Sequence, residues 1–322
     1  MGDRRHILSG SLWPEAGQGT YLCQMDDQAL VQAHSHHPHR FGSFVHAYPV
    51  LSRRAGGISL GVNLNVDKAC NFDCPYCQVD RRIGRERVAS DPERVREELV
   101  QLLDAWEEDR LQSLYPGVDP AHLRLNDVAL SGDGESTMDP GFPGVCDMLA
   151  QLQADRIRVG RTPFRLVLIS NATLLDRPAV QAAVGTLCKL DGEVWGKLDA
   201  GTQGFYHQVN ASRIPLDRIE SNLSWAAANV PLRIQTLFFR YGQLVPDEAE
   251  LCAWLDRLDR ICQKGPVRSV QLHTVARQTA KSGCHPLPLE WLSALARRTT
   301  QRTGVPAESF AGVDVGAIGE GE

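Results

Sequence analysis

From residue 57 onward, short runs of β-branched and apolar residues alternate with longer segments that have a helical period. This alternation favours parallel strands, because each intervening helix carries the chain back across the sheet in a right-handed crossover. The expected strands lie at residues 57–66, 127–131, 164–170, 193–199, 232–239 and 267–275. The expected helices lie near residues 90–109, 140–154, 177–188, 215–228, 246–263 and 288–303.

The number of these strand–helix units sets the expected fold class. Six strands are too few for a closed eight-stranded barrel, so we predict an α/β protein with a partial (β/α)6 TIM-type barrel and its chemistry at the carboxyl ends of the strands. Residues 1–56 are expected to form an N-terminal arm or cap, residues 57–305 the barrel, and residues 306–322 a C-terminal tail. The helix at 90–109 is expected to begin with Ser90 as its cap.

Composition narrows the functional classes. The 322 residues carry a net charge of −5, which does not indicate a nucleic-acid binder. The nine cysteines are an odd number and do not suit a disulfide framework. No signal-peptide run opens the chain, and no stretch approaches about 18 uninterrupted apolar residues, so we expect a cytoplasmic protein without a membrane partner.

Three closely spaced cysteines stand out in "ACNFDCPYCQVD", residues 69–80: Cys70, Cys74 and Cys77. Thiolates are soft ligands suited to zinc or to iron–sulfur iron, and a cluster normally takes four, so three leave one iron open. A structural zinc would need a fourth ligand, and the histidines within residues 34–39 lie more than 30 residues upstream. A redox dithiol would use only Cys74 and Cys77. We favour the open cluster and keep zinc and the dithiol as alternatives.

The C-x3-C-x2-C spacing, with Tyr76 before the third cysteine, resembles the signature of the radical S-adenosylmethionine (radical SAM) superfamily. The resemblance implies that Cys70, Cys74 and Cys77 hold a [4Fe-4S] cluster, that S-adenosylmethionine (SAM) occupies the open iron, and that Tyr76 lies against the adenine. It also implies a one-electron donor such as flavodoxin or ferredoxin. In such enzymes the radical chemistry belongs to the cofactor, while the protein orients it and excludes water.

A second motif follows the second expected strand, in "DVALSGDGESTMDP". Gly132, Gly134, Glu135 and Ser136 stand where the superfamily carries a Gly-Gly-Glu type motif that receives the ammonium of the methionine moiety. Glycine lets the backbone approach a ligand closely, and a carboxylate can hold a cation. The resemblance therefore implies that these residues bind SAM, although many relatives have proline at the position of Ser136.

The third and fourth expected strands end in "LISNATLL" and "WGKLDAG". These segments resemble the iron–sulfur oxidoreductases related to the wybutosine-pathway tRNA enzymes. The resemblance implies that Ser170 and Asn171 contact the nucleotide and that Lys197 and Asp199 face the active site. The alternative for Lys197 and Asp199 is a surface ion pair, but the carboxyl end of a parallel strand is where barrel enzymes keep polar chemistry.

Other polar segments are weaker guides to the substrate. At the end of the sixth strand, His273 is a further catalytic candidate beside Gln271 and Arg277, with a buried structural histidine as the alternative. The histidine tract at 34–40 fits an exposed arm better than a metal site. The arginine-rich segment 81–87 fits a solvated loop better than a phosphate contact, so tRNA, the substrate of the wybutosine-type relatives, is not the favoured partner.

These observations and the resemblance leave three functional hypotheses. In the first, reductive cleavage of SAM yields a carbon radical that acts on a small molecule or nucleoside. In the second, the other C–S bond breaks and a 3-amino-3-carboxypropyl group is transferred to a soft acceptor. In the third, the protein is a non-catalytic, zinc-stabilised nucleic-acid-binding module. The first is preferred.

Overall fold

A curled eight-stranded sheet forms the centre of the computed structural model, which describes residues 28–35, 39–81 and 88–312. Its strand order is β1-β2-β3-β4-β5-β6-β8-β10, and the short strands β7 and β9 pair separately. The main strands are β1 (Ala47–Ser52), β2 (Gly57–Val62), β3 (Leu125–Leu130), β4 (Arg165–Ser170), β5 (Gly192–Lys197), β6 (Leu232–Leu237), β8 (Val267–His273) and β10 (Ala307–Phe310). The small pair consists of β7 (Phe239–Tyr241) and β9 (Cys284–Pro286).

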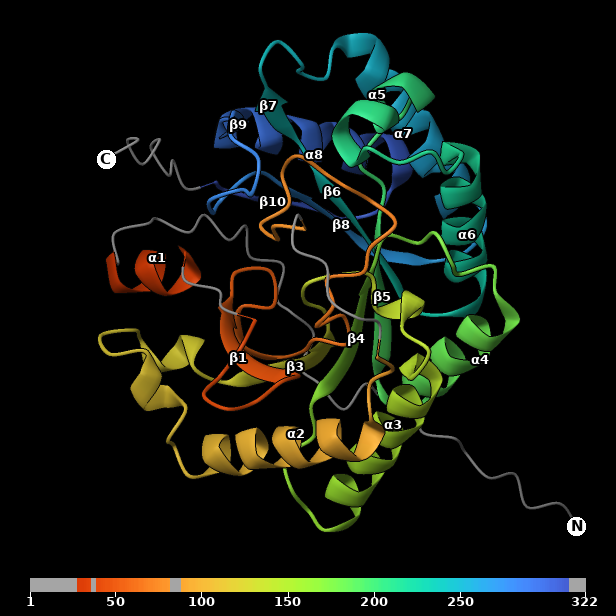
Figure 1. The fold of residues 1–322 in the computed structure, drawn as a ribbon. Coiled ribbons are helices and arrows are strands. Elements are labelled where there is room, and N and C mark those ends of the chain that lie inside the picture. Colours follow the sequence, from red (N-terminus) through yellow and green to blue (C-terminus); the bar gives the residue numbers. More distant parts are fainter. Residues whose placement is uncertain (1–27, 36–38, 82–87, 313–322) are drawn as a thin grey trace, which may run out of the picture.

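Helices line the outer side of this sheet, as Figure 1 shows for α2, α3, α4 and α6. They connect successive strands, and neighbouring helices pack on one another around the sheet. The helices are α1 (Gln28–Ser35), α2 (Pro92–Glu107), α3 (Phe142–Arg158), α4 (Pro178–Leu187), α5 (Gln203–Asn210), α6 (Leu216–Asn229), α7 (Glu248–Cys262) and α8 (Leu289–Thr303). None of the helices in the described part of the chain combines the length and apolar character that a bilayer crossing requires.

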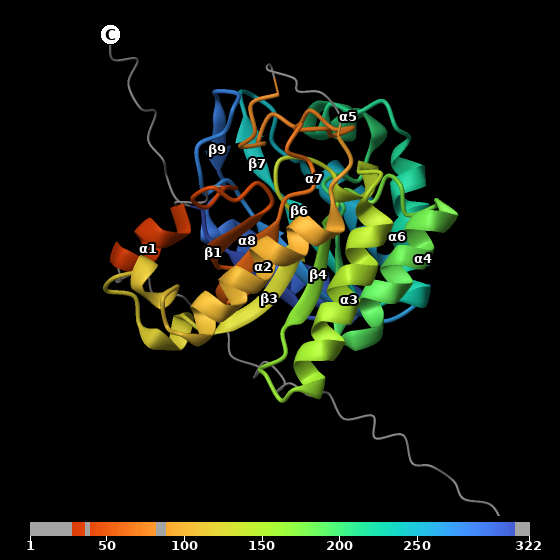
Figure 2. The same cartoon turned by 60° about the horizontal axis from the view of Figure 1, so that its bottom comes forward.

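The predicted fold class is confirmed: all six expected strands are present, and they run parallel in a partial barrel as β2, β3, β4, β5, β6 and β8. Figure 2, which turns the bottom of the molecule forward, shows the helices packed along the outside of β3 and β4. The first strand is shorter than expected, because it ends at Val62 and the following residues turn into a loop at the carboxyl edge of the sheet.

Two strands that the sequence pattern did not predict extend this sheet at its edges. β1 lies within the expected arm of residues 1–56 and pairs antiparallel with β2, while β10 lies within the expected tail and pairs parallel with β8. β1 contains Pro49, a residue that sheets tolerate on edge strands because it cannot donate a ladder hydrogen bond. Arg53, just after β1, donates to the carbonyl of Ala311, just after β10, so a side chain links the two edges.

The start of α2 differs from the prediction in its cap. Asp91, not Ser90, is the N-cap, and its carboxylate accepts from the backbone N–H of Glu93 at 3.0 Å. Ser90 is buried, and its hydroxyl donates to the Leu64 carbonyl at 3.1 Å. The serine therefore ties the helix to the loop after β2, while the aspartate, one residue later, satisfies the free N–H groups of the first turn.

Candidate active site

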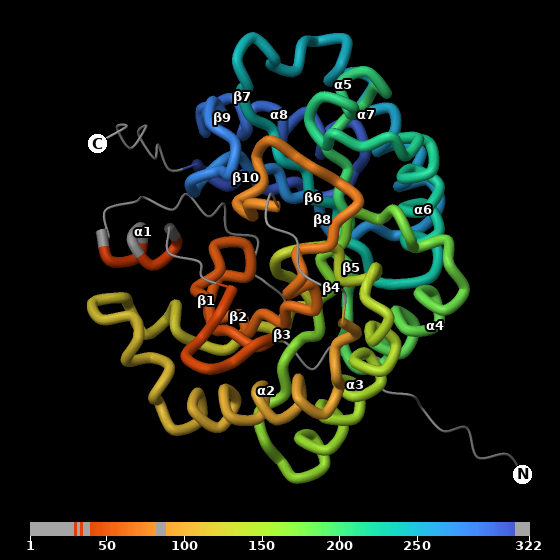
Figure 3. Tube along the Cα trace, viewed as in Figure 1, coloured from red at the N-terminus to blue at the C-terminus, as the bar shows by residue number. Residues whose placement is uncertain are grey.

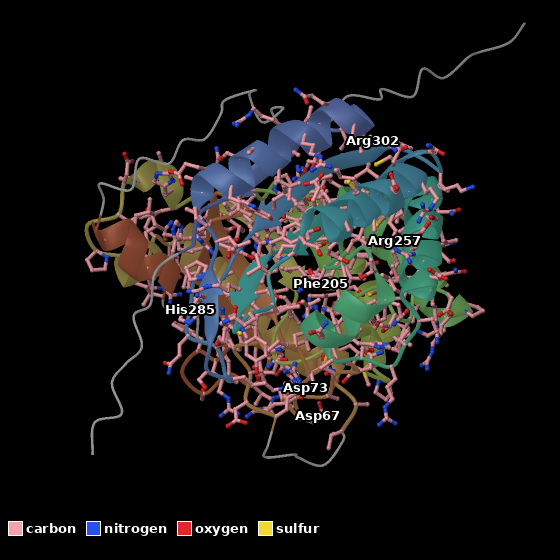
Figure 4. All side chains as sticks on the ribbon, turned by 90° about the horizontal axis from the view of Figure 1, so that it is seen from above. Asp67, Asp73, Phe205, Arg257, His285 and Arg302 are labelled. Atoms are coloured by element: carbon pink, nitrogen blue, oxygen red, sulfur yellow. The ribbon has the colours of Figure 1, made fainter. Side chains whose placement is uncertain are left out.

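The cysteine loop, residues 63–81, runs from the end of β2 across the strand ends toward α5 and is drawn in orange in Figure 3. Its backbone is pinned at two points: Asp73 N donates to the Asn210 carbonyl at 3.1 Å, and Ala280 N donates to the Cys77 carbonyl at 2.8 Å. In the view from above, Asp73 lies at the opposite side of the molecule from Arg302 of α8 (Figure 4). The loop is thus held between α5 and the segment after β8.

All three cysteines of this loop are free thiols, and each sulfur receives a nitrogen donor. Phe72 N lies 3.4 Å from Cys70 Sγ. A guanidinium nitrogen of Arg81 lies 3.0 Å from Cys77 Sγ. Asn210 Nδ2 lies 3.5 Å from Cys74 Sγ. Such donors stabilise negative sulfur, but burial outweighs them: it raises the pKa of Cys70, and it raises the pKa of Cys74 to about 12. A metal that binds these two cysteines must therefore displace their protons.

Arg81 differs from the solvated loop that we expected for residues 81–87. Besides Cys77 Sγ, its guanidinium donates to the Asp133 carbonyl at 3.0 Å. Burial acts to lower the pKa of Arg81, but the nearby sulfurs of Cys77 and Cys70 outweigh it and raise that pKa. Arg81 therefore belongs to the cysteine loop and joins it to the glycine motif after β3, whereas residues 82–87 lie outside the described part of the chain.

The described part of the chain contains no preformed site for a single metal ion. Within residues 28–35, 39–81 and 88–312, no three His, Cys, Asp or Glu side chains are grouped closely enough to hold a single metal ion. A structural zinc needs four ligands about 2.0–2.3 Å from one ion. The preference for a [4Fe-4S] cluster over zinc, which rests on the cysteine spacing, therefore stays a prediction.

The glycine motif after β3 packs directly on the cysteine loop. A Cβ at Gly134 would overlap the carbonyl oxygen of Ala69, and the next residue, Glu135, donates its N–H to that oxygen at 3.0 Å. Gly132 has a φ of 150°, and a Cβ there would come within 2.6 Å of Asn63. Both glycines are therefore required for the close approach of the two loops.

Glu135 is buried, with 3% of its surface exposed, and connects β3 to the end of β4. Its carboxylate accepts from Ser170 Oγ at 2.8 Å, from Asn171 N at 2.7 Å and from Thr137 Oγ1 at 2.6 Å. Burial raises the pKa of Glu135, and these hydrogen bonds offset part of the effect. Ser136, also buried, begins the short 3-10 helix that follows.

The end of β4 also reaches the cysteine loop. Asn171 Nδ2 donates to Asn71 Oδ1 at 2.7 Å and lies 3.9 Å from Cys70 Sγ. Its own Oδ1 accepts from the hydroxyl of Thr173 at 2.7 Å. Four of the predicted SAM-binding residues, at or after the ends of β3 and β4, are thus brought together beside the first cysteine: Gly134, Glu135, Ser170 and Asn171.

A second polar group lies at the end of β5. The phenol of Tyr76 donates to Asp199 Oδ2 at 2.5 Å and accepts from Lys197 Nζ at 2.6 Å. The Asp199 side chain is only 1% exposed, so this is not a surface ion pair. Burial, followed by the Asp199 charge, raises the pKa of Tyr76 well above its ordinary value. The Tyr76 ring packs edge-on against Phe239 at 5.2 Å, and its predicted contact with adenine stays a prediction.

Solved structures with a similar fold include two whose names refer to a radical SAM enzyme or to bound S-adenosylmethionine. TYW1 with a lysine–pyruvate adduct superposes with a TM-score of 0.54 at 16% identity, covering 81% of this chain and 85% of that one. A radical SAM methyltransferase from Sphaerobacter thermophilus has a TM-score of 0.52 at 13% identity, and the match covers 84% of this chain and 71% of that one. SuiB from Streptococcus suis, bound to S-adenosylmethionine, has a TM-score of 0.50 at 10% identity, and the match covers 80% of this chain and 52% of that one. This chain has the fold of the radical SAM enzymes.

Sequence comparison adds a shorter match. UPF0026 proteins from two strains of Helicobacter pylori are 26% identical over 141 residues, which is 42% of this chain and 37% of each relative. The chain thus aligns with little more than a third of the length of these curated relatives. No protein-family model matches it.

In this radical SAM fold, the end of β8 places His273 in the barrel wall, with 7% of its surface exposed. Within the described residues, His273 Nδ1 has no hydrogen-bond partner. Burial, and then the charges of Arg54 and Lys197, lower its pKa well below the ordinary value, so the imidazole is neutral. Gln271, two residues earlier, accepts from Gln235 Nε2 at 2.8 Å and is a structural partner of β6.

The histidine tract is less exposed than expected where the structure describes it. Arg277 Nε donates to the His34 carbonyl at 2.9 Å, which joins the segment after β8 to α1. His39 Nδ1 lies 2.7 Å from Asp133 Oδ1 in the glycine motif, and the His39 ring packs on Tyr48 at 5.2 Å. The arm therefore contacts the candidate site, and Arg277 binds the arm. Residues 36–38 lie outside the described part of the chain.

Proposed function

We propose that this chain is a radical SAM enzyme in which Cys70, Cys74 and Cys77 hold a [4Fe-4S] cluster and SAM binds beside it. One observation carries the proposal: the cysteine loop and the glycine motif are in direct contact, through the 3.0 Å hydrogen bond from Glu135 N to the Ala69 carbonyl. The radical SAM fold and the nitrogen donors on all three sulfurs support it.

The chain's own groups have distinct tasks in this proposal. When bound, the cluster and SAM supply an electron and a cleavable C–S bond, and hence a carbon radical. Glu135 is the carboxylate that would receive the ammonium of SAM, held in place by Ser170 and Asn171. Asn171 also donates a hydrogen bond to Asn71 of the cysteine loop, so the proposed nucleotide site and the cysteine loop are directly connected.

The substrate would lie near Lys197, Asp199 and His273. The side chain of Lys197 is 19% exposed, whereas that of Asp199 is 1% exposed, so Lys197 is the more accessible member of the pair. The neutral imidazole of His273 has a buried Nδ1 that finds no hydrogen-bond partner among the described residues. These groups suit a small molecule or a nucleoside that needs a proton moved or a polar group held. An external donor such as flavodoxin or ferredoxin would supply the electron.

Anaerobic reconstitution with iron and sulfide tests the proposal. We expect a brown protein with about four irons per chain, which forms 5′-deoxyadenosine when reduced in the presence of SAM. Methylthioadenosine as the product would show instead that the other C–S bond is cleaved. A colourless protein that retains stoichiometric zinc would contradict the proposal.

Cysteine variants make the same test specific. Cys70→Ala, Cys74→Ala and Cys77→Ala should each lose the cluster and nucleotide cleavage. Cys252→Ala on the exposed side of α7 is the matched control and should retain both. If any of the first three variants cleaves SAM as the wild type does, the ligand assignment is wrong.

A further inference from the structure

Asn210, the last residue of α5, was not predicted to belong to the site, yet its side chain lies between two parts of it. Its surface is 0% exposed. Its Nδ2 lies 2.9 Å from Asp199 Oδ2, 3.2 Å from the Tyr76 hydroxyl and 3.5 Å from Cys74 Sγ. One amide group therefore contacts both the candidate cluster ligand and the polar group at the end of β5.

The orientation of this amide follows from its neighbours. The Asp199 carboxylate can only accept, and the Tyr76 phenol already donates its proton to that carboxylate. A donor must therefore face them, which places Nδ2 there and Oδ1 on the other side. Within the described residues Oδ1 is buried without a partner, so the contacts of Nδ2 decide how the side chain is held.

The backbone reinforces this position. The Asn210 carbonyl accepts from Asp73 N at 3.1 Å, which joins the end of α5 to the cysteine loop independently of the side chain. The helix ends immediately afterwards, because Ala211 adopts a left-handed conformation with φ 45°. A side-chain substitution at Asn210 thus leaves the main-chain attachment in place.

We propose that Asn210 is a positioning residue that couples Cys74 to the Lys197–Tyr76–Asp199 group. This inference rests on the proposed function. The amide holds Asp199 Oδ2 and the Tyr76 hydroxyl in register with the cysteine loop, and it donates a hydrogen bond to the Cys74 sulfur. Reduction adds negative charge to a cluster and its sulfur ligands, so an N–H donor at that sulfur favours the reduced state and raises the reduction potential.

The remaining contacts make this role testable without loss of the fold. Asp199 Oδ1 accepts from Leu237 N at 3.1 Å, and Lys197 Nζ lies 3.3 Å from Asp199 Oδ2. The carboxylate therefore keeps a backbone donor and a cation when Asn210 is replaced. Asn210→Leu keeps the branched shape with the same number of side-chain heavy atoms and removes the donor, and Asn210→Asp also adds a negative charge beside the sulfur.

The experiment measures the reduction potential of the reconstituted cluster by redox titration with electron paramagnetic resonance, without SAM. We expect Asn210→Leu to keep its iron content while the ratio of reduced to oxidised cluster at a fixed potential falls about threefold, the effect of roughly one hydrogen bond. In Asn210→Asp the ratio of reduced to oxidised cluster should fall further, because the added negative charge opposes reduction. Gln208→Ala, exposed on the same helix, is the control and should match the wild type.

The outcomes separate this inference from the proposed function. If the wild-type protein binds the cluster, but Asn210→Leu and Asn210→Asp have the same reduction potential as the wild type, the role of Asn210 is wrong and the proposed function stands. A wild-type protein that binds no iron would overturn both. If Asn210→Leu does not fold, Asn210→Asp, which has the same shape as asparagine, carries the test.

Discussion

The phenol oxygen of Tyr76 lies 2.5 Å from Oδ2 of Asp199, although the two residues are 123 positions apart in the chain. Tyr76 belongs to the cysteine loop and Asp199 follows β5, so the hydrogen bond joins the loop after β2 to the end of β5. Lys197 completes the group from β5, with Nζ 2.6 Å from the same phenol oxygen and 4.5 Å from the ring centre.

Tyr76→Phe should weaken this group while keeping the ring in place. The variant removes one hydrogen-bond partner from the buried Asp199 and one from Lys197, so we expect a loss of about 1–2 kcal/mol in the free energy of unfolding. A double-mutant cycle with Lys197→Met, measured by urea denaturation, should show a coupling energy of about 1 kcal/mol. Tyr241→Phe on β7 is the control. Strictly additive effects of Tyr76→Phe and Lys197→Met would contradict the observed contact.

Gly134→Ala should separate the glycine motif from the cysteine loop. The new Cβ would overlap the Ala69 carbonyl, so the backbone must move and the hydrogen bond from Glu135 N must lengthen. We expect SAM affinity, measured by equilibrium dialysis on the reconstituted protein, to fall at least about tenfold, as expected from the loss of a few contacts. Gly185→Ala on α4, where a Cβ meets open space, is the control.

The control variant Gly185→Ala has an expected outcome of its own. Alanine is favoured over glycine inside a helix, so Gly185→Ala should leave SAM binding unchanged and raise the free energy of unfolding by about 0.5–1 kcal/mol. If Gly134→Ala also binds SAM as tightly as the wild type, the glycine motif does not position the nucleotide.

Asp127 makes stability depend on pH. Burial raises its pKa from 3.8 to about 6, although Ser59 donates a hydrogen bond to its carboxylate. Between these values the folded chain binds more protons than the unfolded chain, so the free energy of unfolding falls as pH rises. Above about pH 7 the buried Asp127 carboxylate is ionised, and its destabilising effect is fully present. Asp127→Asn should therefore be more stable than the wild type by about 2–3 kcal/mol at pH 8.

The same comparison at low pH serves as the control. At about pH 4 the wild-type carboxyl is largely protonated in the folded state, so thermal or urea unfolding of Asp127→Asn should then match the wild type closely. A stability difference that stays constant from pH 4 to pH 8 would show that Asp127 is ionised throughout in the folded protein.

Glu193, on β5, should be among the side chains on which the barrel most depends. It is 0% exposed and accepts from Arg233 at 3.0 Å, from Arg268 at 2.8 Å and from Trp195 Nε1 at 2.7 Å. Burial acts to raise the pKa of Glu193, but the arginines outweigh it and lower that pKa. Glu193→Ala leaves their charges uncompensated and should cost about 3–5 kcal/mol in urea unfolding.

An exposed ion pair provides the matched comparison. Glu248 of α7 lies 2.6 Å from Arg298 of α8; Glu248 is exposed and Arg298 is half-buried. Glu248→Ala should unfold at nearly the wild-type urea concentration, because exposed pairs gain little in water. If Glu193→Ala and Glu248→Ala lower the free energy of unfolding by the same amount, burial does not explain the importance of Glu193.

Much of the fold could be predicted from residue patterns. The helical period of α2 and the apolar run of β2 are local, and they lead to the parallel order that the structure confirms. β1 and β10 could not be predicted in this way. β1 contains a proline, β10 is the four-residue segment Ala307–Phe310, and each becomes a strand only because the neighbouring β2 or β8 offers an unpaired edge.

The candidate site divides in the same way. Cys70 and Cys77 were singled out by their spacing, and Lys197 by the resemblance of the segment at the end of the fourth predicted strand to the wybutosine-related enzymes. Arg81 and Asn210 were missed, because an arginine beside other arginines and an asparagine at the end of a helix carry no distinguishing pattern.

What the sequence determined by itself is whatever depends on distance along the chain: the cysteine spacing, the strand–helix alternation and the positions of polar residues after strands. Only the tertiary structure decided which side chains meet, such as Asn210 with Cys74, or His39 with Asp133. Covalent geometry and the helical and strand periods act over a few residues, whereas contacts across 94 or 136 positions depend on how whole elements pack.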